Sequence, residues 1–397
     1  MELLKARLMS LSVYKHMLET APVRALLDLC GAKTPEDRIS AYTDLLRSVW
    51  QEGRGSLSES LEWHLKYDES FLGNAVATGS AEQYLLEVAE RDIETLSQVG
   101  LLGDLKVWLR QQCPPEYGPI IENLAELSRG EPLQPKAIFD SYRKKGCGLF
   151  ALGRAFHWEK GTLTQVRQPD AISQADMIGY EFQRNAVIEN TRVMLSGKPT
   201  NNVLLYGDSG TGKSATVKSL INLPEFYNLR LIEIAKNSLD ELTELVRFVG
   251  KHTQKFVLYI DDLSFEQEDK GFSALKTALE GGLERRPDNV AIYVTSNRRH
   301  MIRETFADRQ GDEIHARETL EERSSLSERF GLRLSYLALD KQKYTDMVIE
   351  MCRRLDLPYT GEQLRAEANR WELQHGGRTP RVAMQLVEKL AGQAENQ

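Results

Sequence analysis

The stretch Gly207-Asp208-Ser209-Gly210-Thr211-Gly212-Lys213-Ser214 decides which kind of fold this chain adopts. It matches the pattern G-x-x-x-x-G-K-[ST], in which a glycine-rich loop cradles phosphate groups. An apolar run of strand length, 203–206, precedes it, and the stretch 215–221, which is typical of a helix, follows it. A chance match would lack this context. The sequence therefore predicts a phosphate-binding loop between a strand and a helix.

The residue types of this loop explain how it would hold a nucleoside triphosphate. Glycines let the backbone curl so that successive N–H groups face one anion. The following helix adds the positive end of its dipole. We expect the Lys213 ammonium to reach the β- and γ-phosphates and the Ser214 hydroxyl to bind Mg²⁺. The predicted phosphate site comprises Gly207, Asp208, Ser209, Gly210, Thr211, Gly212, Lys213 and Ser214.

Length and composition restrict the class of protein. The 397 residues predict two or three domains, and the charged and apolar fractions, 27% and 41%, are ordinary for a soluble protein. The formal net charge of −7 provides no general attraction for nucleic acid, although a local basic patch stays open. The four cysteines are scattered without zinc spacing, which favours reduced thiols. We expect a cytoplasmic protein, because the N-terminus lacks a signal-peptide core and no apolar run approaches the ~18 residues of a membrane span.

Four segments follow one another along the chain. Residues 1–145 show helix-like apolar spacing, for example over 84–90 and 101–109, and predict an all-helical domain. Residues 146–170 predict a short hairpin and a linker, with a turn at 159–162.

The second half of the chain has a different pattern. Over 171–338 short apolar strands alternate with helices, as in a parallel α/β sheet. Residues 339–397 predict helices near 340–355, 361–374 and 380–392.

Polar residues end two further strands of this segment. The apolar run 256–260 ends in Asp261-Asp262, where one carboxylate would hold the Mg²⁺ water shell and the next would polarise the attacking water. We assign Asp261 to the metal and Asp262 to the water. The alternative is a terminal Asp that only caps a helix. The run 290–294 ends near Asn297, whose amide would orient the water, unless it forms an ordinary turn.

The order of these elements resembles the AAA+ ATPase superfamily, since a Ser-Leu-Ser-Glu-Arg-Phe-Gly stretch (325–331) and a helical block follow. Within it, the chain is most similar to a bacterial family of predicted AAA+ ATPases of unknown function. The likeness covers about 150–390, whereas residues 1–145 resemble no family that we can name. The matching stretches are Ile178–Glu181, Asn190-Thr191, Asn202–Gly207, Asp261–Phe265, Thr295–His300 and Leu326–Gly331.

The resemblance implies an α/β fold: an AAA+ P-loop parallel sheet flanked by helices, with a C-terminal helical lid and an N-terminal all-helical domain. It also implies ATP and Mg²⁺ as ligands and a homo-oligomer, as a ring or a partial ring.

The resemblance further implies roles for residues outside the loop. Asn297 matches the sensor-1 position, and Ile178 with Gly179 should line the adenine pocket. Arg329 matches the arginine finger that reaches the γ-phosphate of a neighbouring subunit, which suits its permanently charged fork. Arg381 resembles the sensor-2 arginine, with Arg378 as the second choice. For each arginine the alternative is a surface charge.

One position departs from the family pattern. Many AAA+ members carry Asp-Glu at the end of the acidic strand, whereas this chain has Asp261-Asp262. The second side chain is one methylene shorter, and a small displacement weakens a positioning effect strongly. An adjusted backbone or Glu266 would compensate; otherwise hydrolysis is slow.

Three functions are consistent with the sequence. The first is an ATPase that couples hydrolysis in an oligomer to the remodelling of an unknown macromolecular partner, with residues 1–145 as the protein-binding adaptor. The second is an ATP-dependent switch or scaffold with little turnover, which Asp262 favours. The third is a DNA-associated loader-like ATPase using the basic cluster 298–303, which the acidic balance disfavours. The charged stretch 298–323 would be solvent-exposed or would line a subunit interface or pore.

Overall fold

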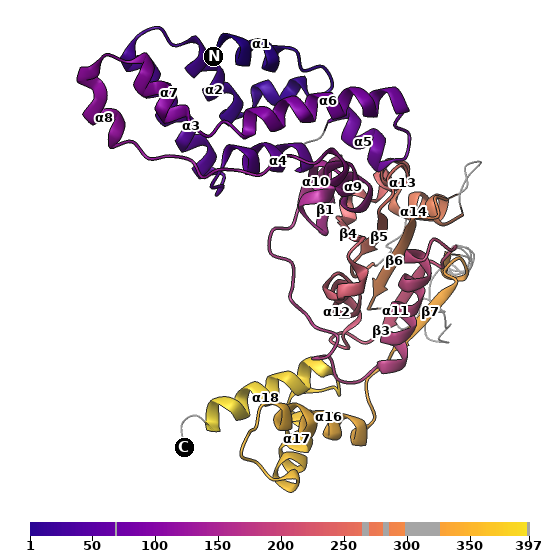
Figure 1. The fold of residues 1–397 in the computed structure, drawn as a ribbon. Helices are drawn as coiled ribbons and strands as arrows, with labels where there is room; N and C mark the ends of the chain where they lie inside the picture. The colour runs from indigo at the N-terminus through magenta and orange to yellow at the C-terminus, as the bar shows by residue number, and fades with distance from the viewer. Residues whose placement is uncertain (68–69, 264–269, 281–285, 298–325, 395–397) are drawn as a thin grey trace. The chain divides into compact units, whose positions relative to one another are not determined.

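The computed structural model describes residues 1–67, 70–263, 270–280, 286–297 and 326–394 (Figure 1). The chain divides into two compact units, Met1–Leu152 and Gly153–Gln397.

The first unit is helical throughout its described residues. Local signals set several helix starts: Thr34 caps α3 by accepting from the Asp37 amide, with Pro35 in the first turn, and Ser70 caps α5 in the same way. Its α-helices are α1 (Glu2–Met9), α2 (Ala21–Gly31), α3 (Pro35–Gln51), α4 (Leu57–Tyr67), α5 (Phe71–Ala77), α6 (Gln83–Gly100), α7 (Leu105–Gln112), α8 (Gly118–Glu122), α9 (Pro135–Lys145) and α10 (Gly148–Leu152), with 3₁₀ turns at Lys15–Glu19 and Pro115–Tyr117.

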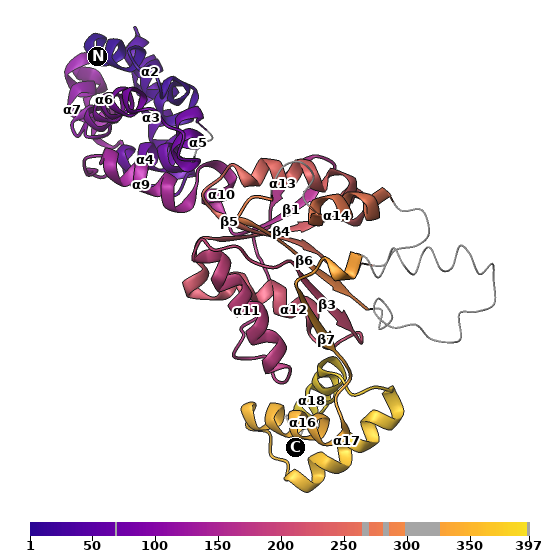
Figure 2. The same cartoon turned by 90° about the vertical axis from the view of Figure 1, so that its right-hand side faces the viewer.

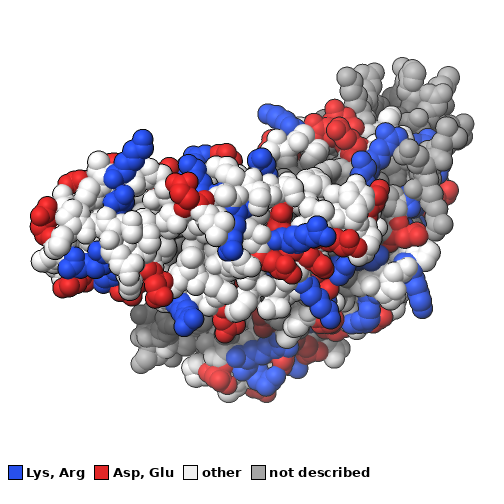
Figure 3. All heavy atoms as spheres, turned by 45° about the horizontal axis from the view of Figure 1, so that its top comes forward, with Lys and Arg blue, Asp and Glu red and all other residues white. Residues whose placement is uncertain are grey.

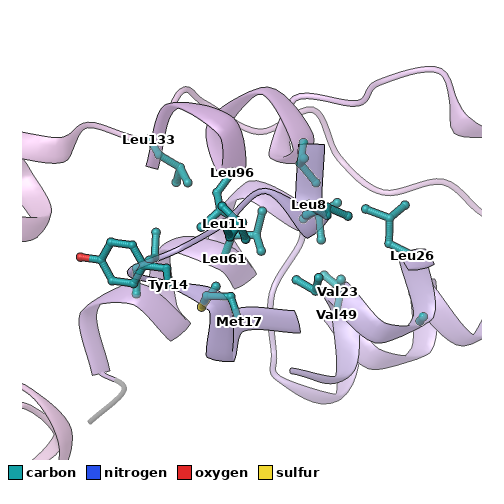
Figure 4. Packing of buried hydrophobic residues seen from close by; sticks show 14 of the residues in the cluster. Leu8, Leu11, Tyr14, Met17, Val23, Leu26, Val49, Leu61, Leu96 and Leu133 are labelled. Carbon is teal, nitrogen blue, oxygen red and sulfur yellow. The ribbon is translucent and has the colours of Figure 1, made fainter. Parts of the chain in front are cut away.

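One hydrophobic core holds this unit together. Leucines from α1, α2, α4 and α6 converge with Tyr14 and Met17 (Figure 4). Among the described residues of this unit one carboxylate is buried: Asp92 of α6, 5% exposed, accepts the backbone N–H groups of Ser12, Val13 and Tyr14 at 2.8–3.0 Å. This contact fixes the segment between α1 and the first 3₁₀ turn against α6.

The second unit is built on a seven-stranded sheet with the order β2-β1-β4-β5-β6-β3-β7. The hairpin pair β1 and β2 is antiparallel, and the remaining neighbours are parallel. The strands are β1 (Ala155–Glu159), β2 (Thr162–Gln165), β3 (Val203–Gly207), β4 (Leu229–Ile234), β5 (Lys255–Ile260), β6 (Val290–Ser296) and β7 (Leu332–Tyr336). Because β3 lies between β6 and β7, the phosphate loop emerges one strand in from the β7 edge of the sheet.

Helices cover both faces of the sheet (Figure 2). On one face α11 (Glu181–Leu195) and α12 (Lys213–Lys218) pack with the 3₁₀ turns Ser219–Asn222 and Pro224–Phe226 against residues such as Val203, Val257 and Ala291. On the other face lie α13 (Leu242–Gly250), preceded by the 3₁₀ turn Lys236–Glu241, and α14 (Lys270–Glu280). The central strands are buried on both sides, which explains their continuous apolar sequences.

Three helices follow β7 and share a separate core: α16 (Lys341–Arg354), α17 (Gly361–His375) and α18 (Pro380–Ala394). Thr360 and Gln363 form a capping box that starts α17. The predicted architecture is therefore confirmed: a parallel α/β sheet flanked by helices, with a C-terminal three-helix segment, called the lid below, and an N-terminal unit built of helices.

Some boundaries differ from the sequence predictions. The helix predicted from residue 101 begins only at Leu105, because 101–104 form a turn. The helix after the phosphate loop starts earlier, at Lys213, and tightens to a 3₁₀ turn after Lys218. The helical unit continues through α10 to Leu152, and the hairpin 155–165 pairs with β4 as part of the main sheet. Among the described helices, none has the length and apolarity needed to cross a membrane.

Candidate nucleotide site

The phosphate loop follows the last residue of β3 with a backbone that requires glycine. Gly207, Gly210 and Gly212 have φ values of 134°, 75° and 93°. A Cβ on Gly207 would lie 2.2 Å from the carbonyl oxygen of Tyr336 on the neighbouring strand. Only glycine therefore lets the loop leave the sheet beside β7. The loop ends at the N-terminus of α12, as the sequence predicts.

Lys213 lies inside this loop and is 5% exposed. Its Nζ donates to the backbone oxygens of Gly207 (3.2 Å) and Asp208 (2.6 Å) and to Oδ1 of Asn297 (2.9 Å). Burial lowers the pKa of the Lys213 ammonium, and the carboxylates of Asp208, Asp262 and Asp261 oppose that shift. The Lys213 ammonium is buried and, among the described residues, donates only to uncharged oxygens. It is therefore suited to exchange these partners for the charged oxygens of a phosphate group.

Asp261 collects hydroxyl donors at the tip of β5. Its Oδ1 accepts from Ser214 Oγ and from Thr295 Oγ1, both at 2.7 Å, and its Oδ2 lies 3.9 Å from Lys218 Nζ. Burial would raise the pKa of Asp261, but the hydroxyls of Tyr259, Ser214 and Thr295 and the Lys218 charge bring it below its usual value. The carboxylate is therefore an anion at neutral pH.

This arrangement fits Mg²⁺. Because the Ser214 hydroxyl donates its hydrogen bond to Asp261, its oxygen lone pairs stay available to a cation. The Asp261 side chain is 30% exposed, so it reaches the water shell of an ion. An all-oxygen donor set with few protein ligands is what Mg²⁺ prefers. No group of three or more His, Cys, Asp and Glu with metal-binding geometry occurs among the described residues.

Asp262 points into the same site but is held by two neighbours. Its Oδ1 accepts from Asn297 Nδ2 at 2.6 Å, and its Oδ2 lies 3.6 Å from Lys236 Nζ. Its backbone is left-handed, with φ 50°, and its amide donates to Thr295 Oγ1 at 2.8 Å. Asp tolerates this conformation better than a longer side chain does, which gives a backbone reason for Asp at this position. Asn297 thus bridges Lys213 and Asp262.

The loop is also tied to the start of the lid. Asp208 accepts the Ala338 amide on Oδ2 (2.7 Å) and donates its own amide to Tyr336 (2.8 Å). The Arg381 amide donates to the Gly210 oxygen at 3.2 Å, which places Arg381 beside the loop. Arg378 instead pairs with Glu372 of α17 at 3.3 Å. Of the two predicted sensor-2 candidates, the structure brings Arg381 to the loop.

The predicted adenine-pocket residues lie between the loop and the lid. Ile178 packs against the lid core, and a Cβ on Gly179, whose φ is 83°, would lie 2.8 Å from Met347 Cε. Tyr180 stacks on Tyr336 with 5.0 Å between ring centroids, and its hydroxyl donates to the Leu337 oxygen at 2.6 Å.

Arg329 is not brought to the phosphate loop of its own chain. It precedes β7, whose first residue, Leu332, pairs with Val203 at the start of β3. The loop follows the other end of β3, so the strand length separates the two by roughly 15 Å. Arg329 is exposed at the amino edge of the parallel strands.

Several residues of the site escaped the sequence analysis. Thr295 and Tyr180 lie in stretches that match the family pattern but were given no role, and no local pattern marks Lys236. The contacts of all three depend on neighbouring strands or on the lid. Glu266 and the charged stretch 298–323, with its basic cluster, lie outside the described residues.

Comparison with known proteins adds the family. A family model described as "Protein of unknown function (DUF815)" matches residues 152–394. This chain belongs to the DUF815 family. The match covers the sheet and the lid of the DUF815 chain and leaves out nearly all of its helical unit.

Solved structures of RuvB from Thermotoga maritima are also similar to the DUF815 chain. The Holliday junction branch migration motor has 15% identity and a TM-score of 0.35, covering 55% of this chain and 63% of that chain. A point mutant of it has 16% identity, a TM-score of 0.37 and coverages of 55% and 63%. The aligned part thus spans a little under two thirds of RuvB. No curated protein gives a significant match.

Proposed function

We propose that this chain is an ATPase that binds Mg²⁺-ATP at the phosphate loop and hydrolyses it in an oligomer to remodel a macromolecular partner. The observation that carries the proposal is the convergence of Lys213, Ser214, Asp261, Asp262 and Asn297 at the carboxyl ends of three adjacent parallel strands. Together they supply a phosphate-binding cation, an oxygen site for Mg²⁺ and a carboxylate–amide pair for the attacking water.

An oligomer is supported by the position of Arg329. The site needs a cation for the charge that develops on the γ-phosphate, and Arg329 of the same chain is at the opposite edge of the sheet. A neighbouring copy would supply it. Arg381, beside Gly210, would contact the phosphates from the lid of the same chain. The helical unit, residues 1–152, would bind the partner.

Mixing two inactive variants tests this function. We expect Lys213→Ala to lose ATP binding and Arg329→Ala to keep it, each with at least about 100-fold slower phosphate release. A mixture of the two variants should regain activity. In a mixed oligomer, the intact phosphate loop of an Arg329→Ala subunit can lie next to the intact Arg329 of a Lys213→Ala subunit. Arg333→Ala, which removes an exposed arginine of β7, is the matched control and should stay active.

Two outcomes would contradict the proposal. If Arg329→Ala hydrolyses ATP as a stable monomer, the shared site is wrong. If the unmodified chain binds no ATP, the whole function is wrong.

A second candidate, an ATP-dependent switch with little turnover, is favoured by the contacts of Asp262. Its carboxylate is occupied by Asn297 and Lys236, and it is one methylene shorter than glutamate. Tight ATP binding without phosphate release, in the presence of excess partner captured with Asp262→Asn, would support the switch. Sustained multiple turnover would exclude it.

A DNA-associated role has less support. On the face drawn in Figure 3, Lys and Arg are interspersed with Asp and Glu over the described residues, without a broad basic area. Binding to DNA that weakens steeply as salt increases would be needed to support it.

A further inference from the structure

Tyr259 lies fully buried in β5, two residues before Asp261. Side chains of a strand alternate between faces, so Val257, Tyr259 and Asp261 share the face that packs against α12. The Tyr259 ring is part of the core under that helix. Its hydroxyl therefore lies beneath the predicted metal site.

The Tyr259 hydroxyl is surrounded by the groups that would hold Mg²⁺. The Asp261 carboxylate and the Ser214 and Thr295 hydroxyls lie close enough to act on it electrostatically. Even so, among the described residues none meets it with normal hydrogen-bond geometry. The Ser214 and Thr295 hydroxyls instead donate hydrogen bonds to Oδ1 of Asp261.

Other buried tyrosines of the same sheet are satisfied. Tyr293, the residue that pairs with Tyr259 on β6, has its hydroxyl 3.0 Å from Asn190 Nδ2 and 2.8 Å from Thr191 Oγ1. The Tyr336 hydroxyl lies 3.1 Å from Thr216 Oγ1. A buried hydroxyl without a partner is unfavourable, and phenylalanine would fill the same space without that cost. The Tyr259 hydroxyl thus lies near the Asp261 carboxylate and lowers the pKa of that group, but it makes no hydrogen bond of normal geometry with a described residue at the place where a ligand is expected.

We propose that Tyr259 is a positioning residue of the metal site. With Mg²⁺-nucleotide bound, Asp261 would hold the water shell of the ion, and the Tyr259 hydroxyl would donate a hydrogen bond to that carboxylate and fix its orientation. The proposal rests on the proposed function, because it needs Mg²⁺-nucleotide at this site. Groups that orient a metal-binding carboxylate in this way strengthen metal binding.

The test compares Tyr259→Phe with Tyr293→Phe in the full chain. A fluorescent ATP analogue is titrated with Mg²⁺, and thermal unfolding is recorded in parallel. We expect Tyr259→Phe to need roughly 10-fold more Mg²⁺ for half-saturation. Its affinity for the analogue in EDTA and its melting temperature should not fall. Tyr293→Phe should melt earlier, because it loses two contacts, and should need the same Mg²⁺ as the unmodified chain.

The outcomes separate the inference from the function. An unmodified chain that binds no analogue overturns both. Mg²⁺-dependent binding that is identical in the unmodified chain and in Tyr259→Phe overturns the role of Tyr259 alone. A lower melting temperature of Tyr259→Phe with unchanged Mg²⁺ dependence shows a purely structural hydroxyl and also overturns it.

Discussion

The helical unit and the nucleotide-binding unit each place a carboxylate among several hydrogen-bond donors, but the donors differ. In the helical unit, Asp92 accepts three backbone amides from one short segment and is 5% exposed. In the unit with the phosphate loop, Asp261 accepts two side-chain hydroxyls, one from α12 and one from β6, and keeps 30% of its side chain exposed. The Asp92 carboxylate holds a backbone segment in place, whereas the Asp261 carboxylate is partly exposed to solvent at the carboxyl end of β5.

The difference suggests a way to distinguish a carboxylate that only stabilises the fold from one that we propose to bind a ligand. Backbone amides cannot move away without unfolding the segment, and Asp92 is buried, so this carboxylate is not presented to a ligand. Hydroxyl donors keep their oxygen lone pairs, so the groups around Asp261 can bind a cation while their O–H groups still donate to the carboxylate. The predictions below test this contrast.

The largest expected effect is on catalysis by Asp261. We expect Asp261→Asn to slow phosphate release at least about 100-fold, because the neutral amide no longer holds the Mg²⁺ water shell. Its melting temperature should change little, since the residue is partly exposed. Steady-state phosphate release and calorimetric unfolding measure the two. A strong loss of stability with normal turnover in Asp261→Asn would contradict this prediction, because Asp261 would then stabilise the fold instead of serving the reaction.

Asp92 should show the opposite behaviour. Asp92→Ala leaves the amides of Val13 and Tyr14 buried without a partner, which we expect to cost about 3 kcal/mol of unfolding free energy. Denaturant unfolding measures it, with Asp28→Ala, an exposed acid of α2, as the control. ATP binding should not change below the melting transition; a loss of ATP binding in folded Asp92→Ala would contradict the contrast.

A smaller effect is expected at Asp262. Asp262→Asn should keep the left-handed backbone, which Asn also favours, and should retain ATP affinity. We expect phosphate release to fall about 10-fold, less than for a well-placed general base, because the carboxylate is already bound by Asn297 and Lys236. Unchanged turnover would show that Asp262 does not activate the water.

The smallest expected effect is the pH dependence of ATP affinity. Burial lowers the pKa of Lys213 in the free chain, and phosphate groups would raise it again on binding. ATP binding therefore takes up a proton at alkaline pH, and affinity is full below the free-chain pKa of Lys213 and falls as pH rises through it. Calorimetry between about pH 7 and pH 10 should show a few-fold weakening. A flat profile would contradict the role of the ammonium.

Local patterns predicted those parts of the fold that depend on neighbouring residues along the chain. The loop 207–214, the strand ends at Asp261 and Asn297, and the three lid helices all carry their signal in a short stretch of sequence. The fold class followed from their order. The sequence analysis missed the short connection 101–104 and the early end of α12. Apolar spacing does not mark the residue at which a helix ends.

The remaining site residues could not be predicted, because their contacts cross the fold. Lys236 reaches Asp262 from the end of β4, and Tyr259 has a hydroxyl whose surroundings come from three different elements. In the sequence, Tyr259 is part of an apolar strand, and nothing there distinguishes its hydroxyl from those of other buried tyrosines. The choice between Arg378 and Arg381 likewise depended on the Gly210 oxygen, which accepts the amide of Arg381.

The most direct test of the central claim is the stoichiometry and affinity of Mg²⁺-ATP binding, measured by calorimetry on the purified chain and on Lys213→Ala. We predict one site per chain, with affinity lowered at least about 100-fold by Lys213→Ala and unchanged by Lys198→Ala, which removes an exposed lysine just before β3. Equal affinity of all three proteins, or no binding by the unmodified chain, would contradict the assignment of loop 207–214 as the nucleotide site.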